Sequence, residues 1–301
     1  MPSIGVARAA SVQSRYGHMR RLSLLLLVGL SLAGCRSAEE RAQDYYQSGQ
    51  KFLAANDNPR AAIEFKNAIR LKKDMLPAWR GLAQADERDH RWTELVPALR
   101  TIIDLAPNDV DAELKLARLL LYAGSADQAL AVVKGLDDTG NVNVAALKAA
   151  LFFKLNDRLN AIREAQIALK IDPNNLEALM VTAADRLKNG DAQGALQILD
   201  SGPVSSANDL GVQLFKARIF EQMGDLPQVE ALLQKLIELY PKEVTFRKQL
   251  VKFYIDQNRA NDAENELRTI IALDPKNSDA VLDLVRYLFT TKGPAAARTE
   301  L

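Results

Sequence analysis

A repeated spacing of about 34 residues constrains the fold of this chain more than any other sequence feature. Pro275 lies one such period after Pro241, and Pro241 lies two periods after Pro173. Gly224-Asp225 follows Gly190-Asp191 at the same spacing. Each period reads as a helix, a tight turn, a second helix and a helix stop. A period of this length that holds two helices is typical of a stacked array of helical hairpins.

The composition agrees with an all-helical chain. Aromatic residues make up 6% of the 301 residues, and glycine and proline are sparse, which disfavours a sheet protein. Residues 1–34 contain four arginines and no acidic residue, so the rest of the chain holds 35 basic and 38 acidic residues. This near balance gives no reason to expect nucleic acid as a partner.

The N-terminal segment reads as an export signal. Met19-Arg20-Arg21 precedes an apolar run from Leu22 to Ala33, which small residues follow. A basic stretch, a short apolar core and small residues make up a secretory signal. The run is too short to cross a bilayer as a helix, which takes about 20 apolar residues. Met19 is an alternative start, because the residues from Met19 onward form a complete signal by themselves.

The end of this signal predicts a lipid anchor. Leu32-Ala33-Gly34-Cys35 resembles the lipobox of bacterial lipoproteins. This resemblance implies that residues 1–34 are a cleaved signal peptide and that Cys35 receives several acyl chains such as palmitate, which together hold a protein stably on a membrane. Arg36 stands where an Asp would retain an enterobacterial lipoprotein in the inner membrane. The resemblance therefore favours the outer membrane, with the chain facing the periplasm.

The remaining chain divides into a tether and a repeat array. Residues 35–41 are the acylated cysteine and a short charged tether, and residues 42–301 are the array. The eighth unit breaks off after its first helix, so we expect either that the sequence is a fragment of a longer protein, which we favour, or that the end of the array pairs with something else. The predicted units are 42–75, 76–109, 110–141, 142–175, 176–209, 210–243, 244–277 and a partial 278–301.

Small residues recur at two positions of the units, counted from the first residue of each. The eighth position is Gly49, Ala83, Ala117, Ala149, Ala183, Ala217, Val251 and Val285, and the twentieth is Ala61, Leu95, Ala129, Ala161, Ala195, Val229, Ala263 and Ala297. Small side chains at helix crossings allow close backbone approach. The pattern resembles the tetratricopeptide repeat. That resemblance implies an all-α, right-handed α-solenoid of about seven and a half repeats.

The same resemblance implies a ligand-binding surface. In tetratricopeptide repeats, side chains of the first helices line a concave groove that binds protein segments. The sequence does not indicate an oligomeric state. Some members clamp a terminal carboxylate with a Lys/Asn pair, which Arg80 and Gln84 replace here. The residues of this chain that match groove positions are Tyr46, Arg80, Gln84, Arg118, Tyr122, Phe153, Lys154, Met180 and Lys188.

Catalytic chemistry is not expected from this sequence. The chain after residue 34 has one histidine, His90, and one cysteine, so no Cys/His pair or multi-histidine metal set can be built from it. Gly-rich phosphate loops are missing too. His90 falls in a turn, where we expect it to be solvated. We predict neither a metal nor a cofactor, and a protein that is not an enzyme.

Recognition is therefore the predicted function. Residues 58–69 resemble the first repeats of lipoproteins from exopolysaccharide and exosortase-type export systems. This resemblance implies an anchored scaffold that binds proteins during assembly or export of an envelope component. Two alternatives stay open. The array could bind glycan or peptidoglycan directly, or it could be the positioning arm of an enzyme domain beyond Leu301.

One segment departs from the repeat pattern. Ser201-Gly202-Pro203-Val204-Ser205-Ser206 puts a glycine and a proline where the second helix of its unit should continue. We expect that helix to end early and the array to have its weakest interface between residues 200 and 210.

Overall fold

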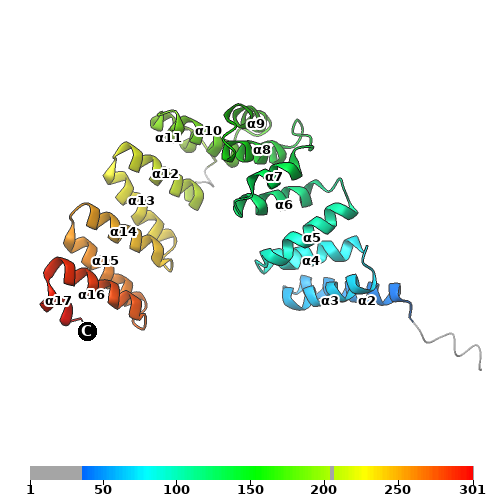
Figure 1. Ribbon diagram of the computed structural model, residues 1–301, viewed down its shortest axis with the longest axis horizontal. Helices are drawn as coiled ribbons and strands as arrows, with labels where there is room; N and C mark the ends of the chain where they lie inside the picture. The colour runs from blue at the N-terminus through cyan, green and yellow to red at the C-terminus, as the bar shows by residue number, and fades with distance from the viewer. Residues whose placement is uncertain (1–35, 204–206, 301) are drawn as a thin grey trace, which may run out of the picture. The chain divides into compact units, whose positions relative to one another are not determined.

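The computed structural model describes residues 36–203 and 207–300, and the regular structure in these ranges is helical, with α-helices, a 3₁₀ turn at residues 207–208 and no strand (Figure 1). The predicted all-α fold is confirmed. The predicted signal peptide and Cys35 lie outside the described residues. The helices are α2 (Ala38–Ala54), α3 (Asn58–Leu71), α4 (Leu76–Arg88), α5 (Trp92–Leu105), α6 (Val110–Tyr122), α7 (Ala126–Val133), α8 (Val142–Lys154), α9 (Arg158–Ile171), α10 (Leu176–Lys188), α11 (Ala192–Asp200), α12 (Leu210–Met223), α13 (Leu226–Leu239), α14 (Val244–Asp256), α15 (Ala260–Leu273), α16 (Ser278–Lys292) and α17 (Pro294–Arg298).

These helices form consecutive pairs, α2 with α3 through α16 with α17. We call the even-numbered member of each pair its first helix and the odd-numbered member its second helix. The chain forms two compact units, Met1–Leu119 and Leu120–Leu301, which we call the N-terminal and C-terminal units. The division falls within α6.

The first helix begins earlier than the tether assignment implied. Ser37 caps α2: its hydroxyl accepts a hydrogen bond from the Glu40 amide, and the Glu40 carboxylate accepts one from the Ser37 amide. This reciprocal capping box satisfies two amides that a bare helix start would leave without partners. Residues 38–41, assigned to the tether, are therefore the first turn of α2.

Nearly every pair reverses direction through a residue with a positive φ. The residue at the fifteenth position of seven units is left-handed: Asn56, His90, Gly124, Asn156, Gly190, Gly224 and Asn258. Glycine and asparagine adopt this conformation most easily. In several pairs an aspartate follows directly and caps the second helix, as Asp57 does by accepting a hydrogen bond from the Arg60 amide.

The small residues lie where the helices pack. All eight side chains at the twentieth position are buried, from Ala61 and Ala129 at 0% exposure to Ala297 at 4%. Most of those at the eighth position are buried as well, including Ala117, Ala149 and Ala183 at 0%. Their burial agrees with the expected close packing of helix backbones.

The core of the N-terminal unit is organised around one aromatic ring. Phe65 of α3 is completely buried and lies between Gly49 of α2 and Gly81 of α4. A Cβ atom added to Gly49 would lie 2.7 Å from Phe65 Cε1, and one added to Gly81 would lie 2.5 Å from Phe65 Cζ. The ring therefore occupies the space that side chains at both glycines would need.

Two second helices are short. α11 ends at Asp200 after nine residues, as the Gly202-Pro203 sequence predicted, and residues 204–206 of this segment lie outside the described residues. α7 has eight residues. It belongs to the third predicted unit, residues 110–141, which is two residues shorter than the 34-residue period. The loop after α7 is held by the buried ammonium of Lys148, which donates hydrogen bonds to the Leu136 carbonyl at 2.6 Å and to Asp138 at 2.8 Å.

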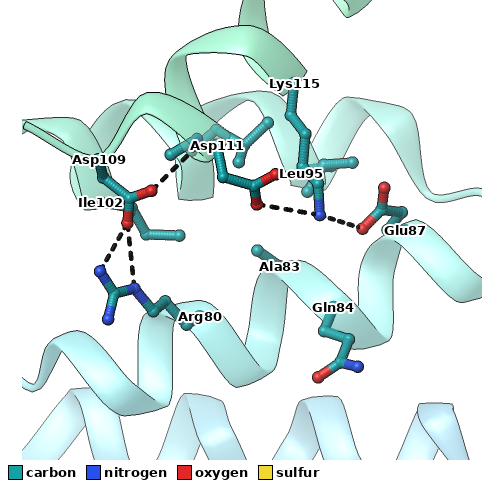
Figure 2. Close-up of a pocket in the computed structure, with 11 residues that line it drawn as sticks. Arg80, Ala83, Gln84, Glu87, Leu95, Ile102, Asp109, Asp111 and Lys115 are labelled. Atoms are coloured by element: carbon teal, nitrogen blue, oxygen red, sulfur yellow. Dashed lines mark hydrogen bonds and ion pairs between the residues drawn. The ribbon is translucent and has the colours of Figure 1, made fainter. Parts of the chain in front are cut away.

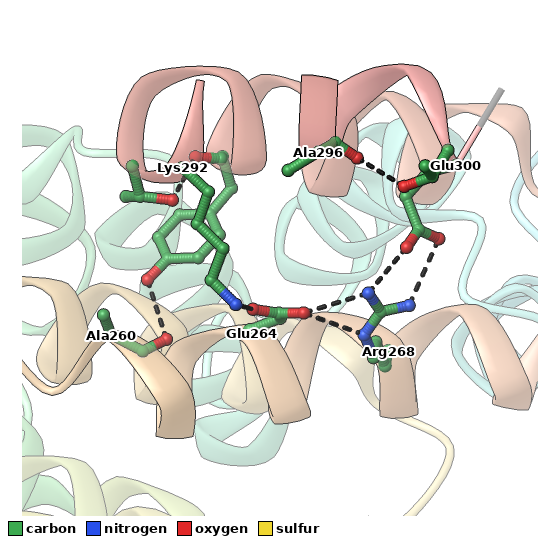
Figure 3. A network of polar contacts seen from close by, with 9 residues as sticks. Ala260, Glu264, Arg268, Lys292, Ala296 and Glu300 are labelled. Atoms are coloured by element: carbon green, nitrogen blue, oxygen red, sulfur yellow. Dashed lines mark hydrogen bonds and ion pairs between the residues drawn. The ribbon is translucent and has the colours of Figure 1, made fainter. Parts of the chain in front are cut away.

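A polar network holds the last pair of helices together (Figure 3). Arg268 of α15 donates hydrogen bonds to Glu264 and, from both terminal nitrogens, to Glu300 beyond α17. Lys292 at the end of α16 pairs with the other oxygen of Glu264, and the Tyr287 hydroxyl donates to the Ala260 carbonyl at 2.8 Å. These contacts join α15 to both helices of the last pair.

Replacing Gly81 with alanine should destabilise the protein by about 2 kcal/mol, because the new methyl group overlaps the buried Phe65 ring and an overpacked core must distort. Chemical denaturation followed by circular dichroism measures the effect. Gly135→Ala is the matched control, since an added Cβ there has no heavy atom within 4 Å. Equal stability of the two variants would contradict this account of the core.

Candidate functional site

A cavity of 420 Å³ opens in the N-terminal unit among α4, α5 and the start of α6 (Figure 2). We call it the α4–α6 pocket. Two of the predicted groove residues, Arg80 and Gln84, line it. The complete lining is Arg80, Ala83, Gln84, Glu87, Leu95, Leu99, Ile102, Asp109, Asp111, Ala112 and Lys115.

Arg80 and Asp109 form one side of the pocket. Arg80 Nε and Nη2 donate hydrogen bonds to Asp109 Oδ2, at 3.1 and 2.6 Å. Asp109 Oδ1 accepts one from the Ala112 amide at 3.1 Å, so the same carboxylate caps the start of α6. Burial alone would raise the pKa of Asp109, but the hydrogen bonds and the charge of Arg80 outweigh it and hold this pKa below its usual value.

Lys115 and two carboxylates form the opposite side. Lys115 Nζ lies 2.9 Å from Glu87 Oε2 on α4 and 3.5 Å from Asp111 Oδ2, one helical turn away on α6. Burial alone would lower the pKa of the ammonium, but the hydrogen bond to Glu87 and the charge of Asp111 raise it above its usual value. Asp111 is 79% exposed at its side chain, so its pair is weak and easily exchanged.

The floor of the pocket is apolar. Leu95, Leu99 and Ile102 of α5 are each 2% exposed, and the small side chains of Ala83 and Ala112 leave the space above them open. This arrangement can take an apolar side chain on the floor. The rim can meanwhile exchange its ion pairs for hydrogen bonds to a bound chain. The geometry suits binding and contains no arrangement of a nucleophile and a base.

The pocket brings together only part of the predicted groove. Gln84 is exposed, and Figure 2 shows its amide directed away from the ion pairs. Tyr46 of α2 is half-buried, accepts a hydrogen bond from Gln50 at 2.6 Å and does not line the pocket. Arg118 of α6 is half-buried and also lies outside the pocket lining.

The carboxylates of the pocket are not among the residues predicted from the sequence: Glu87, Asp109 and Asp111. A signal for Asp109 was present in the sequence, because it directly precedes the predicted start of a first helix, where acidic caps are common.

In the C-terminal unit the remaining predicted residues are divided among several places. Lys188 of α10 lies over the Phe153 ring, 6.0 Å from its centroid, and also pairs with Asn156. Lys154 directly follows Phe153 in the sequence, and its side chain is exposed. Met180 is half-buried against a core cluster of α10, α11 and α12, so it contributes to packing. Tyr122 is 82% exposed, an unusual exposure for an aromatic side chain.

His90 has a structural role. It is exposed, as predicted, and has a φ of 56°, at the position where other units have glycine or asparagine. Its ring lies 5.2 Å from Trp92. The left-handed turn therefore accounts for the position of His90. Across residues 36–203 and 207–300, no group of three His, Cys, Asp or Glu side chains could hold a metal ion.

None of the helices in the described ranges is long and apolar enough to cross a membrane.

Comparison with known proteins supports the repeat fold. Residues 220–285 match the sequence profile of the tetratricopeptide repeat. A tetratricopeptide repeat protein from Parabacteroides merdae matches the structure with a TM-score of 0.64 and 13% identity, over 83% of this chain and 99% of that chain. Identity at this level shows a common fold and no more. A search of curated proteins gave no significant match.

Two further solved structures share the fold. The Pseudomonas aeruginosa protein pilF matches with a TM-score of 0.51 and 14% identity, over 71% of this chain and 99% of that chain. PilW, described as a widely conserved type IV pilus biogenesis factor, matches with a TM-score of 0.54 and 12% identity, over 69% of this chain and 98% of that chain. The predicted solenoid of tetratricopeptide-type hairpins is thus confirmed as a fold.

Replacing Asp109 with asparagine should destabilise the protein by about 1 kcal/mol at neutral pH, because asparagine can still cap α6 but loses the charge that pairs with Arg80. The pKa of Asp109 is lowered on folding, so its contribution is present above the unfolded pKa of about 4 and is lost as the pH falls through the folded pKa.

The stability difference between wild type and Asp109→Asn should therefore shrink in acid, which denaturation curves at several pH values will measure. Asp111→Asn, at an exposed carboxylate of the same helix, is the control and should have little effect at any pH. A difference that persists unchanged at pH 3 would disprove the role of the Asp109 charge.

Proposed function

We propose that this protein is a non-catalytic scaffold, anchored in the bacterial cell envelope through lipid on Cys35, which binds partner proteins with the first-helix surfaces of its helical pairs. The α4–α6 pocket is the observation that carries the binding part of this proposal. It combines an apolar floor, exchangeable ion pairs on its rim and an exposed amide at Gln84. Concave sites of this kind can bind peptide segments, because the apolar surface takes a side chain and a few polar groups fix its orientation.

The anchor part of the proposal rests on the sequence that precedes the helices. Leu32-Ala33-Gly34-Cys35 closes an export signal, and α2 begins at Ala38, soon after the cysteine. A lipid on Cys35 would place α2 close to the membrane surface, and several acyl chains supply enough apolar area for stable attachment.

Assembly or export of an envelope component, such as exopolysaccharide, is the process we propose. The support is the resemblance of residues 58–69 to the first repeats of lipoproteins from such systems. PilW, a pilus biogenesis factor, shares the fold, although a similarity of this level carries no function across. We propose the outer membrane as the location and the periplasm as the compartment that the array faces.

Glycan binding is a second candidate, favoured by one observation. Tyr122 is 82% exposed, and a solvent-exposed aromatic ring is a suitable platform for a sugar. If glycan is the ligand, the protein will be retained on insoluble peptidoglycan and Tyr122→Ala will abolish that retention.

Photocrosslinking in cells tests the scaffold. A photoreactive residue replacing Gln84 sits in the pocket without breaking any of its ion pairs. We expect it to capture one discrete protein. The control is the same residue at Arg100, which is exposed on α5, a second helix. Capture of the same proteins from both positions, or of none from Gln84, would refute partner binding in the pocket.

Replacing Cys35 with serine should release the protein from the membrane fraction, because serine lacks the thiol that carries the first lipid. Phase separation in detergent and intact mass determine the outcome. Ser37→Ala is the control: it removes the cap of α2 but leaves the cysteine, so the protein should remain lipid-modified. Membrane association of Cys35→Ser equal to that of wild type would rule out the anchor.

A further inference from the structure

The C-terminal end of α3 lies beside the first turn of α2. Lys72, the residue that follows α3, forms an ion pair with Glu39 in the first turn of α2. Behind this contact, Ala68 of α3 and Ala42 of α2 are completely buried in one core cluster. The beginning of α2 and the end of α3 therefore form one end of the first hairpin.

The proposed lipid anchor is joined to the same end. Arg36 and Ser37 are the two residues between Cys35 and the first residue of α2. Consecutive Cα atoms are about 3.8 Å apart, so the Cα atom of Cys35 is within about 8 Å of the Ser37 Cα atom in any conformation. A lipid on Cys35 would hold this end of the hairpin against a membrane surface.

Exposed cations gather at this end. Arg41 lies in the first turn of α2, Arg70 in the last turn of α3, and Lys73 in the turn that follows. None of the three forms an ion pair with another residue that the structure describes, and Arg70 donates a hydrogen bond to the Asn67 amide oxygen at 3.2 Å. Lys66 is exposed one helical turn before Arg70, on the same face of α3. We call Arg41, Lys66, Arg70 and Lys73 the anchor-side cations.

The carboxylates at this end cancel only part of that charge. Three of them already have partners: Asp44 pairs with Arg36, Glu39 pairs with Lys72, and Glu40 accepts the amide hydrogen bond of the capping box. Asp74 is exposed in the turn after α3. Glu40 and Asp74 offset two of the four anchor-side cations, so this end of the hairpin keeps a positive charge.

An indole ring lies next to these cations. Trp79, in the first turn of α4, is half-buried and donates a hydrogen bond from Nε1 to the Lys73 carbonyl at 2.8 Å. Tryptophan is favoured where a protein meets the headgroups of a membrane, because its ring has an apolar body and a polar edge. The same end thus combines positive charge with a side chain suited to a membrane interface.

We propose that the anchor-side cations and Trp79 form a membrane-contact surface, which binds the headgroups of anionic phospholipids and so orients the first hairpin on the membrane. This inference rests on the proposed anchor at Cys35 and adds a second contact, which acts through charge. The anchor keeps the surface at a high effective concentration beside the headgroups, so a weak affinity is sufficient. Each Lys or Arg near an anionic lipid surface strengthens binding about fivefold.

Vesicle binding tests this surface without the anchor. The predicted mature chain with Cys35→Ser, residues 35–301, carries no lipid and retains every described helix. At low ionic strength we expect it to sediment with phosphatidylglycerol vesicles and not with phosphatidylcholine vesicles. Binding should fall steeply with added salt, because salt screens exposed charges. At physiological salt the contact is weak, and the acyl chains of the anchor supply the attachment.

A pair of substitutions locates the contact. Arg70→Gln should weaken binding to phosphatidylglycerol vesicles about fivefold, because it removes one charge near the surface. Lys170→Gln is the matched control, since Lys170 is exposed at the same position of the fourth unit, and it should change binding by less than about twofold. Both side chains are exposed, so circular dichroism of the two variants should match wild type.

The two tryptophans of the chain report its orientation. Trp79 lies in the first turn of α4 and Trp92 follows the opposite end, and a helix of 13 residues is about 20 Å long. On phosphatidylglycerol vesicles with spin-labelled headgroups, Trp92→Phe, which retains Trp79, should lose most of its fluorescence. Trp79→Phe, which retains Trp92, should keep most of its fluorescence.

Three results would overturn the proposal: no binding to phosphatidylglycerol vesicles at low ionic strength, equal effects of Arg70→Gln and Lys170→Gln, or equal quenching of the two tryptophans. All three measurements use a chain without lipid. They therefore fail independently of the anchor, which the release of Cys35→Ser from the membrane fraction tests.

Discussion

A left-handed residue at the turn of nearly every helical pair is the constraint on which the rest of this structure depends. At the fifteenth position of seven units the backbone has a positive φ, and this fixes where the first helix ends and the second begins. With the turn fixed, side chains at a given position of each unit recur on the same helix face. His90 shows the strength of this requirement, because it accepts a conformation that costs most side chains about 1 kcal/mol.

Close packing between neighbouring helical pairs is the second constraint on the structure. Helix backbones approach closely only where small residues meet, and the eighth and twentieth positions provide them. The extreme case is Phe65, whose ring fits because Gly49 and Gly81 have no side chains. Ion pairs such as those of Arg268 with Glu264 and Glu300 lie partly exposed and orient the last helices more than they stabilise them. Stability in such an array therefore comes mainly from contacts between neighbouring pairs.

The sequence was sufficient to predict the helices but only part of the site. Pro173, Pro241 and Pro275 mark helix ends because proline restricts the residue before it, and the early end of α11 followed from Gly202-Pro203. These are local effects of single residues on the backbone. Position within a repeat singled out Arg80 and Gln84, which both line the α4–α6 pocket. It could not reveal that Asp109, from the following pair, binds Arg80, because that contact depends on how two pairs stack.

The same reasoning explains how one repeat architecture can expose different side chains along its length. The turn and the packing positions determine the course of the backbone, so the exposed positions of the first helices can vary at a small cost to the stability of the fold. In the N-terminal unit those positions and the adjoining loop combine Arg80 with carboxylates around an apolar floor. In the C-terminal unit they present Arg218, Lys252 and Arg286 in one register. These exposed side chains lie outside the core, so they can differ from one unit to another while the helices beneath remain the same.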